Sequence, residues 1–251
     1  MDLQVRQNPP RGRLAGLPLV PQLEQAVWVG RRLVHGGRAY ECIGPLRQRN
    51  DHGVTGRLRF VLASASPARL RSLRAAGFDP AVVVSGVDED GVDHLRPAAA
   101  ALALAERKAA AVARRLSGAL VLGCDSLLEF DGAAMGKPAS AAEATERWRR
   151  MRGRTGVLHT GHCVIDTGAV RRAAAVASTV VHFAVPSDDE VAAYVASGEP
   201  LAVAGAFTID GRGGVFVDAV DGDPGTVIGV SLPLLRRLLA ELDIAVTSLW
   251  V

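Results

Sequence analysis

The chain of 251 residues has few cysteines, few aromatic residues and almost no lysine. Its three cysteines, Cys42, Cys124 and Cys163, lie far apart without a CxxC pair. This pattern argues against a disulfide framework or a structural zinc site and favours a reducing cytoplasm. No apolar stretch reaches the roughly 18 residues that suggest a membrane span, and no apolar segment near the N-terminus predicts a secretory signal.

The remaining composition is that of a globular protein. Hydrophobic residues make up 49% of the chain and charged residues 22%, which excludes a disordered, collagen-like or coiled-coil chain. The length suffices for one large domain or two small ones. Aromatic residues make up only 4%, which argues against a surface that stacks nucleic-acid bases.

The positive charge is concentrated at the N-terminal end. Residues 1–57 hold nine arginines and four acidic residues, a net charge of +5, whereas the other 194 residues hold 20 basic and 22 acidic residues, a net charge of −2. We therefore expect no nucleic-acid binding by the main part of the chain. Binding of an acidic partner or a nucleic acid stays open only for the N-terminal segment.

The segment 1–57 differs from the rest in composition, with four prolines near its start and many Gly, Arg and Gln residues. We expect it to be a poorly ordered or weakly packed extension, or the product of a start codon placed too early. Residues 58–251 are predicted to form the folded domain.

From residue 58 onward, strand and helix patterns alternate, which predicts the α/β class with a mixed sheet. The extended run 126–130 is expected to close in a turn after the third strand. We expect strands at 59–63, 81–84, 119–124, 157–165 and 173–185, and helices at 67–76, 97–117, 140–152, 188–197 and 231–242.

A hydroxyl-rich turn follows the first strand of this domain and leads into a helix. Ser66 is suited to the helix N-cap and Pro67 to the first helical position. Backbone N–H groups, the positive end of the helix dipole, Ser64 and Arg69 can together bind an anion there. The alternative is an ordinary helix cap. A Walker P-loop is excluded because GxxxxGK[ST] is absent.

Carboxylates follow two of the predicted strands. Asp88, Glu89 and Asp90 form an acidic turn whose oxygens suit Mg²⁺ or Mn²⁺, with a solvated turn as the alternative. Asp125 is expected to end an apolar strand at the edge of the sheet. A carboxylate in that place can bind a metal or activate water, and a turn aspartate is the alternative.

Only two of the 29 basic residues are lysines, Lys108 and Lys137. An ammonium group is a compact charge suited to phosphate, whereas a guanidinium is a planar fork. The alternative is codon bias with two chance survivors. A glycine-rich stretch at 204–214 allows close approach of the backbone to a ligand, with Asp210 and Arg212 as candidate contacts and a simple hairpin as the alternative.

The histidines and cysteines give weaker evidence for a metal site or a nucleophile. His159 and His162 lie three residues apart in a predicted strand, so they face opposite sides and form a poor chelate. Cys163 lies in the same strand and is expected in the core. Cys124 has no nearby histidine base in the sequence, which argues against a thiolate nucleophile.

In their order along the chain, these motifs resemble the Maf family of nucleoside triphosphate pyrophosphatases, from about Leu58 to Asp243. The family signature S-x-S-P-R-R is similar to Ser64-Ala65-Ser66-Pro67-Ala68-Arg69. Both lysines fall on family motif positions. The other matching motifs are Asp88-Glu89, Lys108, Gly123-Cys124-Asp125-Ser126, Gly136-Lys137-Pro138, Ala204-Gly205-Ala206-Phe207 and the stretch from Asp221-Gly222-Asp223 to Ser231-Leu232-Pro233.

The resemblance implies hydrolysis of a nucleoside triphosphate between the α and β phosphorus atoms, with Mg²⁺ or Mn²⁺, to a monophosphate and pyrophosphate. It implies an ITPase-like elongated mixed sheet with flanking helices and two lobes around a cleft, often as a homodimer. The residues that would carry the family roles are Ser64, Ser66 and Arg69 for the triphosphate, Lys108 and Lys137 for charge neutralisation, Glu89 and Asp125 for the metal, and Asp125 as the proton acceptor for the attacking water.

The resemblance assigns base choice to three positions, occupied here by Ala68, Ser126 and Asp210. Ala68 replaces the first arginine of the family signature. Asp210 stands where the branch that hydrolyses dTTP and UTP has glutamine. The base preference therefore stays open, with non-standard or pyrimidine triphosphates as the expected substrates.

Two functions are consistent with these motifs. The first is a house-cleaning pyrophosphatase, which the combination of acidic and lysine residues favours because binding alone needs no metal-and-base pair. The second is a nucleotide-binding regulator of cell division and septum formation with little catalytic activity. Tight triphosphate binding without pyrophosphate release would favour the regulator.

Overall fold

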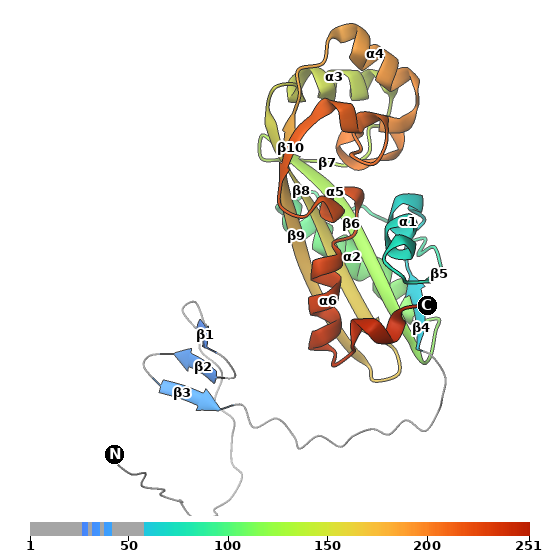
Figure 1. The fold of residues 1–251 in the computed structure, drawn as a ribbon, viewed down its shortest axis with the longest axis vertical. Helices are drawn as coiled ribbons and strands as arrows, with labels where there is room; N and C mark the ends of the chain where they lie inside the picture. The colour runs from blue at the N-terminus through green and yellow to red at the C-terminus, as the bar shows by residue number, and fades with distance from the viewer. Residues whose placement is uncertain (1–26, 30–31, 36–37, 42–57) are drawn as a thin grey trace, which may run out of the picture. The chain divides into compact units, whose positions relative to one another are not determined.

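A computed structural model describes residues 27–29, 32–35, 38–41 and 58–251 of the chain (Figure 1). The chain divides into two compact units, Met1–Val54 and Thr55–Val251. In the first unit the described residues form an antiparallel sheet of order β1-β2-β3. Its strands are β1 (Val27–Val29), β2 (Arg32–His35) and β3 (Arg38–Glu41). We predicted that residues 1–57 are poorly ordered. Apart from these three strands, that prediction falls on residues outside the described part of the chain.

A seven-stranded mixed sheet forms the centre of the second unit, in the order β10-β9-β8-β6-β4-β5, with β7 paired to β6. Strand β4 runs parallel to β5 and β6, and the remaining pairs are antiparallel. The strands are β4 (Arg59–Leu62), β5 (Ala81–Val82), β6 (Ala119–Phe130), β7 (Ala133–Met135), β8 (Thr155–Asp166), β9 (Arg171–Phe183) and β10 (Val217–Asp221).

Helices pack on both faces of this sheet, which confirms the expected α/β class (Figure 1). The α-helices are α1 (Pro67–Ala75), α2 (Pro97–Ala113), α3 (Ala141–Met151), α4 (Asp188–Ala196), α5 (Pro224–Ile228) and α6 (Leu232–Glu241). The 3₁₀ turns are η1 (Glu199–Ala202), η2 (Ala204–Ala206), η3 (Arg212–Phe216) and η4 (Val246–Leu249). Among the described residues, no helix has both the length and the apolar character needed to cross a membrane.

The alternation of side chains along β6 places α2 and α6 on opposite faces of the sheet. Leu120 and Leu122 are fully buried and belong to the same apolar cluster as Leu235 of α6. Val121 points the other way and packs in a second cluster with Val112 of α2. Successive side chains of a strand point to opposite faces of the sheet, so a strand covered on both faces carries apolar residues at consecutive positions.

A third apolar cluster surrounds Trp148 at the other end of the long strands, near α3 and α4 (Figure 1). The Trp148 ring is fully buried and makes edge contacts with Phe183, Tyr194 and Phe216. Its indole N–H donates to the Ala206 carbonyl at 2.8 Å, which satisfies its one polar atom. The strands β6, β8 and β9 thus connect two separately packed regions.

Strand β6 does not end at Asp125, so that expectation is wrong. The ladder with β8 runs without a break from Leu120 to Glu129 and pairs Asp125 with Gly161. The strand that ends here is β4, whose last paired residue, Leu62, faces Leu122. Asp125 therefore lies in the middle of a long strand, beyond the point where its neighbour β4 stops.

Candidate active site

The turn after β4 has the predicted cap geometry. The Ser66 hydroxyl accepts a hydrogen bond from the Arg69 backbone N–H at 3.4 Å, and Pro67 occupies the first turn of α1. The Ser64 hydroxyl accepts from the Ser66 backbone N–H at 3.2 Å. The turn is thereby fixed with both hydroxyls beside the positive end of a helix, an arrangement suited to an anion.

Arg69 is turned inward and joins three segments of the chain. It donates from Nη1 to the Ser64 hydroxyl at 3.0 Å, from Nη2 to the Ser126 hydroxyl at 2.9 Å and from Nε to the Gly229 carbonyl at 2.8 Å. The side chain is buried. Gly229 has a φ of +117°, and a Cβ there would lie 2.9 Å from Nε of Arg69, so this position requires glycine.

The Ser126 hydroxyl belongs to a directed chain of hydrogen bonds. The Thr160 hydroxyl donates to the Thr226 carbonyl at 2.7 Å, so its proton is used there. Because the Ser126 and Thr160 oxygens are 2.8 Å apart, Ser126 is the donor of that pair. Ser126 therefore accepts from Arg69 and donates to Thr160, and its hydroxyl remains an acceptor toward any ligand.

Lys108 of α2 lies between two carboxylates. Its Nζ is 2.5 Å from Oδ1 of Asp125 and 2.6 Å from Oε1 of Glu89. The Lys108 and Asp125 side chains are 12% and 9% exposed, whereas Glu89 is 60% exposed. The sequence analysis singled out all three residues separately, and the structure brings them into direct contact.

The surroundings of Asp125 raise the pKa of its carboxyl group. Burial is the largest cause, because it disfavours the charged form, and Glu89 adds to it. The positive charges of Lys108 and Arg69 act in the opposite direction. The result is a buried carboxylate with increased affinity for a proton, held beside a permanent positive charge.

Two glycines allow α2 to approach the sheet closely enough for this contact. A Cβ at Gly123 of β6 would lie 2.4 Å from the Ala105 carbonyl oxygen, and one at Gly161 of β8 would lie 2.3 Å from that of Ala101. Both distances are far shorter than a van der Waals contact. Glycine at these positions thus sets the distance between α2, which carries Lys108, and β6.

Within the acidic turn only Glu89 contacts the lysine. Asp88 accepts a hydrogen bond from the Asp90 backbone N–H at 2.9 Å, which shapes the turn. Arg107 donates to the Asp90 carbonyl at 2.8 Å and ties the turn to α2. Among the described residues no group of three or more His, Cys, Asp and Glu side chains is arranged to hold a metal ion.

Lys137 is exposed, and no carboxylate of the described residues pairs with it. The structure does not bring it into contact with Asp125 or Lys108.

The loop that carries Lys137 contacts the late glycine-rich loop. Gly136 accepts a hydrogen bond from the Gly205 backbone N–H at 3.1 Å, so two of the predicted motifs are joined. Gly205 has a φ of +70°, and a Cβ there would lie 2.7 Å from Leu128.

The late glycine-rich loop folds around Glu199, a residue that the sequence analysis missed. Its Oε1 accepts from Thr208 Oγ1 at 2.7 Å, the Gly213 N–H at 2.9 Å and the Tyr194 hydroxyl at 3.1 Å, and its Oε2 accepts from the Arg212 N–H at 3.0 Å. Burial raises the pKa of Glu199, but these hydrogen bonds outweigh it and lower the pKa.

Asp210 lies within this loop and contacts α1. Its Oδ2 is 3.0 Å from Nη2 of Arg71, with side-chain exposures of 26% and 65%. Arg212, also predicted as a ligand contact, is fixed through its backbone N–H to Glu199. Ala68, the third position linked to base choice, is a half-buried residue of the first turn of α1.

The structure places His159 and His162 on opposite faces of β8, as predicted, and buries both Cys124 and Cys163. His159 contacts Ser178 and Glu129 on one face of β8, whereas Nε2 of His162 accepts from the Ser231 backbone N–H at 2.8 Å on the other. Burial lowers the pKa of His162 to about 4. Burial also raises the pKa of Cys124 to about 12, so it is no thiolate nucleophile.

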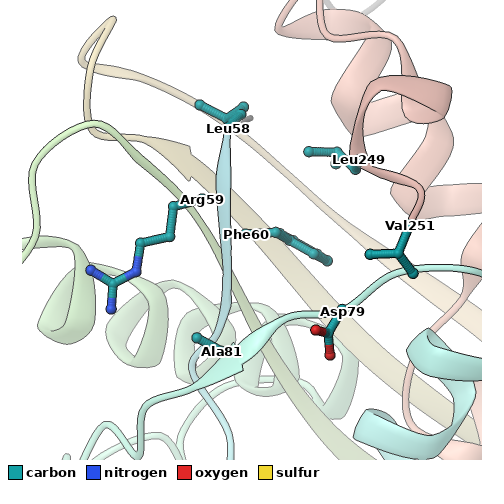
Figure 2. A pocket seen from close by; sticks show the side chains of 7 residues that line it. All are labelled: Leu58, Arg59, Phe60, Asp79, Ala81, Leu249 and Val251. Carbon is teal, nitrogen blue, oxygen red and sulfur yellow. The ribbon is translucent and has the colours of Figure 1, made fainter. Parts of the chain in front are cut away.

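A cavity of about 300 Å³ lies elsewhere, at the start of β4 (Figure 2). Leu58, Phe60 and Leu249 supply its apolar walls, and Arg59 and Asp79 are its charged lining residues. None of the predicted site residues lines it. The candidate site at the end of β4 is therefore defined by its polar contacts and not by this cavity.

Comparison with known proteins shows the family to which the chain is related. The family described as Maf-like protein matches residues 59–242. A protein of Salinispora tropica is 64% identical over 198 residues, which cover 77% of this chain and 88% of that protein. Proteins of Streptomyces avermitilis and of Mycobacterium sp. (strain JLS) are 62% and 52% identical and are covered to 95% and 98%. All three are named nucleoside triphosphate pyrophosphatase.

Proposed function

This chain belongs to the family of Maf-like proteins, and on that premise we propose that it is a nucleoside triphosphate pyrophosphatase. The observation that carries the proposal is the buried carboxylate of Asp125 in contact with Lys108, next to the capped turn before α1. The reaction splits a nucleoside triphosphate and water into a nucleoside monophosphate and pyrophosphate. The bond that breaks joins the α phosphorus to the oxygen that bridges it to the β phosphorus.

The triphosphate binds at the N-terminal end of α1. Ser64 and Ser66 face it with their hydroxyls, and the helix dipole favours its negative charge. Arg69 uses three of its N–H groups to bond Ser64, Ser126 and the Gly229 carbonyl, and the remaining N–H groups of its guanidinium are available to the phosphates. Lys137 adds an exposed ammonium group from the loop after β7.

Asp125 accepts the proton of the attacking water. Its raised pKa makes it a stronger proton acceptor than an exposed aspartate, while the positive charge of Lys108 favours its ionised form. As the phosphates enter, the Lys108 ammonium stabilises the negative charge that builds up on the oxygens of the breaking bond. The proton on Asp125 is afterwards released to solvent or to the departing pyrophosphate.

The residues present fit a divalent cation of the Mg²⁺ or Mn²⁺ type. Asp125 and Glu89 each contact Lys108 through one carboxylate oxygen, Oδ1 and Oε1, which leaves their second oxygens, Oδ2 and Oε2, as hard ligands for a cation. Magnesium is commonly held by one or two carboxylates together with substrate phosphates, so a larger protein ligand set is not required. When bound, the cation would neutralise phosphate charge and polarise the phosphorus–oxygen bonds.

The remaining expectations from the sequence stay predictions. They are a cytoplasmic enzyme that forms a homodimer, acts on non-standard or pyrimidine nucleotides, uses Ala68, Ser126 and Asp210 for base choice, and binds neither a membrane nor a nucleic acid. The directed hydrogen bonds of Ser126 support its part in that choice, because they leave the hydroxyl only as an acceptor.

The test is a product assay on the full chain. The protein is incubated with Mg²⁺ or Mn²⁺ and a panel of normal and modified nucleoside triphosphates, and the products are separated by ion-exchange chromatography. We expect equal amounts of monophosphate and pyrophosphate from one or a few substrates. Diphosphate and inorganic phosphate would contradict the proposed reaction, and tight triphosphate binding without any product would favour the regulator of cell division.

A further inference from the structure

The loop that carries Lys137 is held at two points by helix α3. Arg147 of α3 donates from Nη1 to the Gly136 carbonyl at 2.6 Å. Glu143, one helical turn earlier, accepts from the Ala139 backbone N–H with Oε2 at 2.8 Å. The two contacts lie on either side of Lys137 in the chain. The backbone of this loop is therefore fixed both before and after the lysine.

The two α3 side chains also contact each other. Nη2 of Arg147 donates to Oε1 of Glu143 at 2.5 Å, so each side chain uses one group for its partner and another for the loop. The Arg147 side chain is only 13% exposed. The hydrogen bond from Ala139, followed by that from Arg147, lowers the pKa of Glu143, which favours its charged form. We call Glu143 and Arg147 the loop clamp.

The same helix holds the late glycine-rich loop. The Gly136 carbonyl that accepts from Arg147 also accepts from the Gly205 backbone N–H at 3.1 Å, since a carbonyl oxygen has two lone pairs. Trp148, the next residue of α3, donates to the Ala206 carbonyl at 2.8 Å. Helix α3 thus fixes two of the loops that the sequence motifs single out.

A neighbouring ion pair on α3 shows what an ordinary surface pair looks like. Glu146 and Arg149 are 4.0 Å apart, with side chains that are 64% and 51% exposed. Such pairs contribute little to the stability of a helix. The loop clamp differs because its arginine is largely buried and both of its members bond to the backbone of a loop. Stabilisation of the helix alone would not require these contacts.

Lys137 depends on its backbone for its direction. Its side chain is exposed and has no hydrogen-bond or ion-pair partner among the described residues. Pro138 is buried, and a proline favours an extended backbone in the residue before it. The four-carbon stem of a lysine is flexible, so the place that its ammonium group can reach is set by where the loop stands.

We propose that Glu143 and Arg147 are positioning residues that hold the Lys137 ammonium group where it meets the phosphates of a bound nucleoside triphosphate. This inference rests on the proposed function and on the part that it gives to Lys137. The loop clamp acts through the backbone of the loop and not by touching the phosphates. Its effect on the reaction must therefore depend on the presence of Lys137.

A double-mutant cycle tests this dependence. The kcat/KM for pyrophosphate release is measured for the wild-type chain, Arg147→Gln, Lys137→Gln and the double variant. We expect Lys137→Gln to lower it by about tenfold or more, the usual range for a hydrogen bond to a charged group. Arg147→Gln should lower it by about three- to tenfold in the wild-type chain but by less than about twofold in the Lys137→Gln chain, because neighbouring residues of one network are not additive.

Two further variants keep the result specific. Glu143→Gln retains an acceptor for the Ala139 N–H and loses the charge that holds Arg147, so it should show a smaller loss with the same dependence on Lys137. Arg149→Gln is the matched control, since it removes an arginine of the same helix that pairs with Glu146. It should keep the wild-type kcat/KM in both backgrounds.

Three results would overturn the inference while the proposed function stands. They are an equal loss from Arg147→Gln with and without Lys137, a wild-type kcat/KM in Arg147→Gln, and a wild-type kcat/KM in Lys137→Gln. Absence of pyrophosphate release from every substrate of the wild-type chain would instead contradict the proposed function. The same cycle, measured on the dissociation constant of a triphosphate in equilibrium dialysis, then decides the inference separately. Circular dichroism of each variant distinguishes these results from loss of folding.

Discussion

Asp125 combines burial with a neighbouring positive charge. Burial alone would leave the carboxyl group protonated over a wide pH range, and an ammonium group alone would make it a weak base. Here burial raises the pKa while Lys108 and Arg69 lower it. The net effect is a raised pKa, so Asp125 is a stronger base than an exposed aspartate.

Lys108→Gln is expected to shift the acid limb of the pH–rate profile to higher pH. Activity requires ionised Asp125 and so falls as the pH falls through its pKa. Lys108 lowers that pKa through its charge and its hydrogen bond at 2.5 Å, and removing the ammonium group therefore raises it. The measurement is kcat/KM for pyrophosphate release against pH, with the residual activity of the variant normalised to its own maximum.

Lys137→Gln is the matched control for this shift. It removes the other lysine of the chain, which makes no contact with Asp125, so it should lower the rate without moving the acid limb. An acid limb at the wild-type position in Lys108→Gln would show that Asp125 is not the group that titrates.

At the scale of single residues, the residue types of the candidate site were predictable from the sequence, but the directions of their side chains were not. Ser66 and Asp125 stand out in the sequence as polar residues that follow apolar runs, and both lie at the candidate site. The inward turn of Arg69 depends on Ser126 and Gly229, which the fold brings from distant segments. Glu199 gave no signal because a single acidic residue next to a proline is common on surfaces.

Helix α2 and strand β6 form the element pair on which the site depends. Their separation is set by Gly123 and Gly161, where added side chains would meet the α2 backbone itself. A backbone cannot move aside as a flexible side chain can. The contact between Lys108 and Asp125 is therefore a consequence of packing between elements as well as of residue choice.

Gly161→Ala is expected to destabilise the fold and to lower turnover. The new Cβ would lie 2.3 Å from the Ala101 carbonyl oxygen, so α2 must move away from β8 and β6. Overpacking of this kind costs about 1–3 kcal/mol of unfolding free energy. Urea unfolding gives the free energy, and the product assay gives the turnover.

Gly136→Ala is the control for stability, because its Cβ would meet only the Leu127 side chain at 3.9 Å. It should unfold within about 1 kcal/mol of the wild type, the range of a mild substitution. Equal stability of Gly161→Ala and the wild type would contradict the close packing of α2 against the sheet.

Element types were predictable because the apolar periods of strands and helices are distinct along most of the domain. The continuation of β6 beyond Asp125 was not, since a polar residue in a strand resembles a strand end in sequence. Only the pairing of Asp125 with Gly161 on β8 keeps the chain extended there. The short strand β10 lies in a glycine-rich stretch and shows no period of its own.

On the scale of the whole molecule, the family match and the candidate site both fall within the second unit. The match covers residues 59–242, and the unit spans Thr55–Val251. The net positive charge of the chain comes from residues 1–57, which carry +5, whereas residues 58–251 carry −2.

Removal of residues 1–54 is expected to leave pyrophosphate release within about twofold of the full chain, because no proposed catalytic residue lies there. The measurement is kcat/KM of the shortened chain on the best substrate. A loss of activity in a shortened chain with native circular dichroism would give the N-terminal unit a part in catalysis.

The most direct test of the account is the turnover of Asp125→Asn with the best triphosphate substrate. The change keeps the shape of the side chain and removes the proton acceptor. We expect a loss of about 10²- to 10⁴-fold in kcat, the usual contribution of a general base, with triphosphate binding retained in equilibrium dialysis. Turnover close to that of the wild type in a folded Asp125→Asn protein would contradict the assignment of Asp125 as the base.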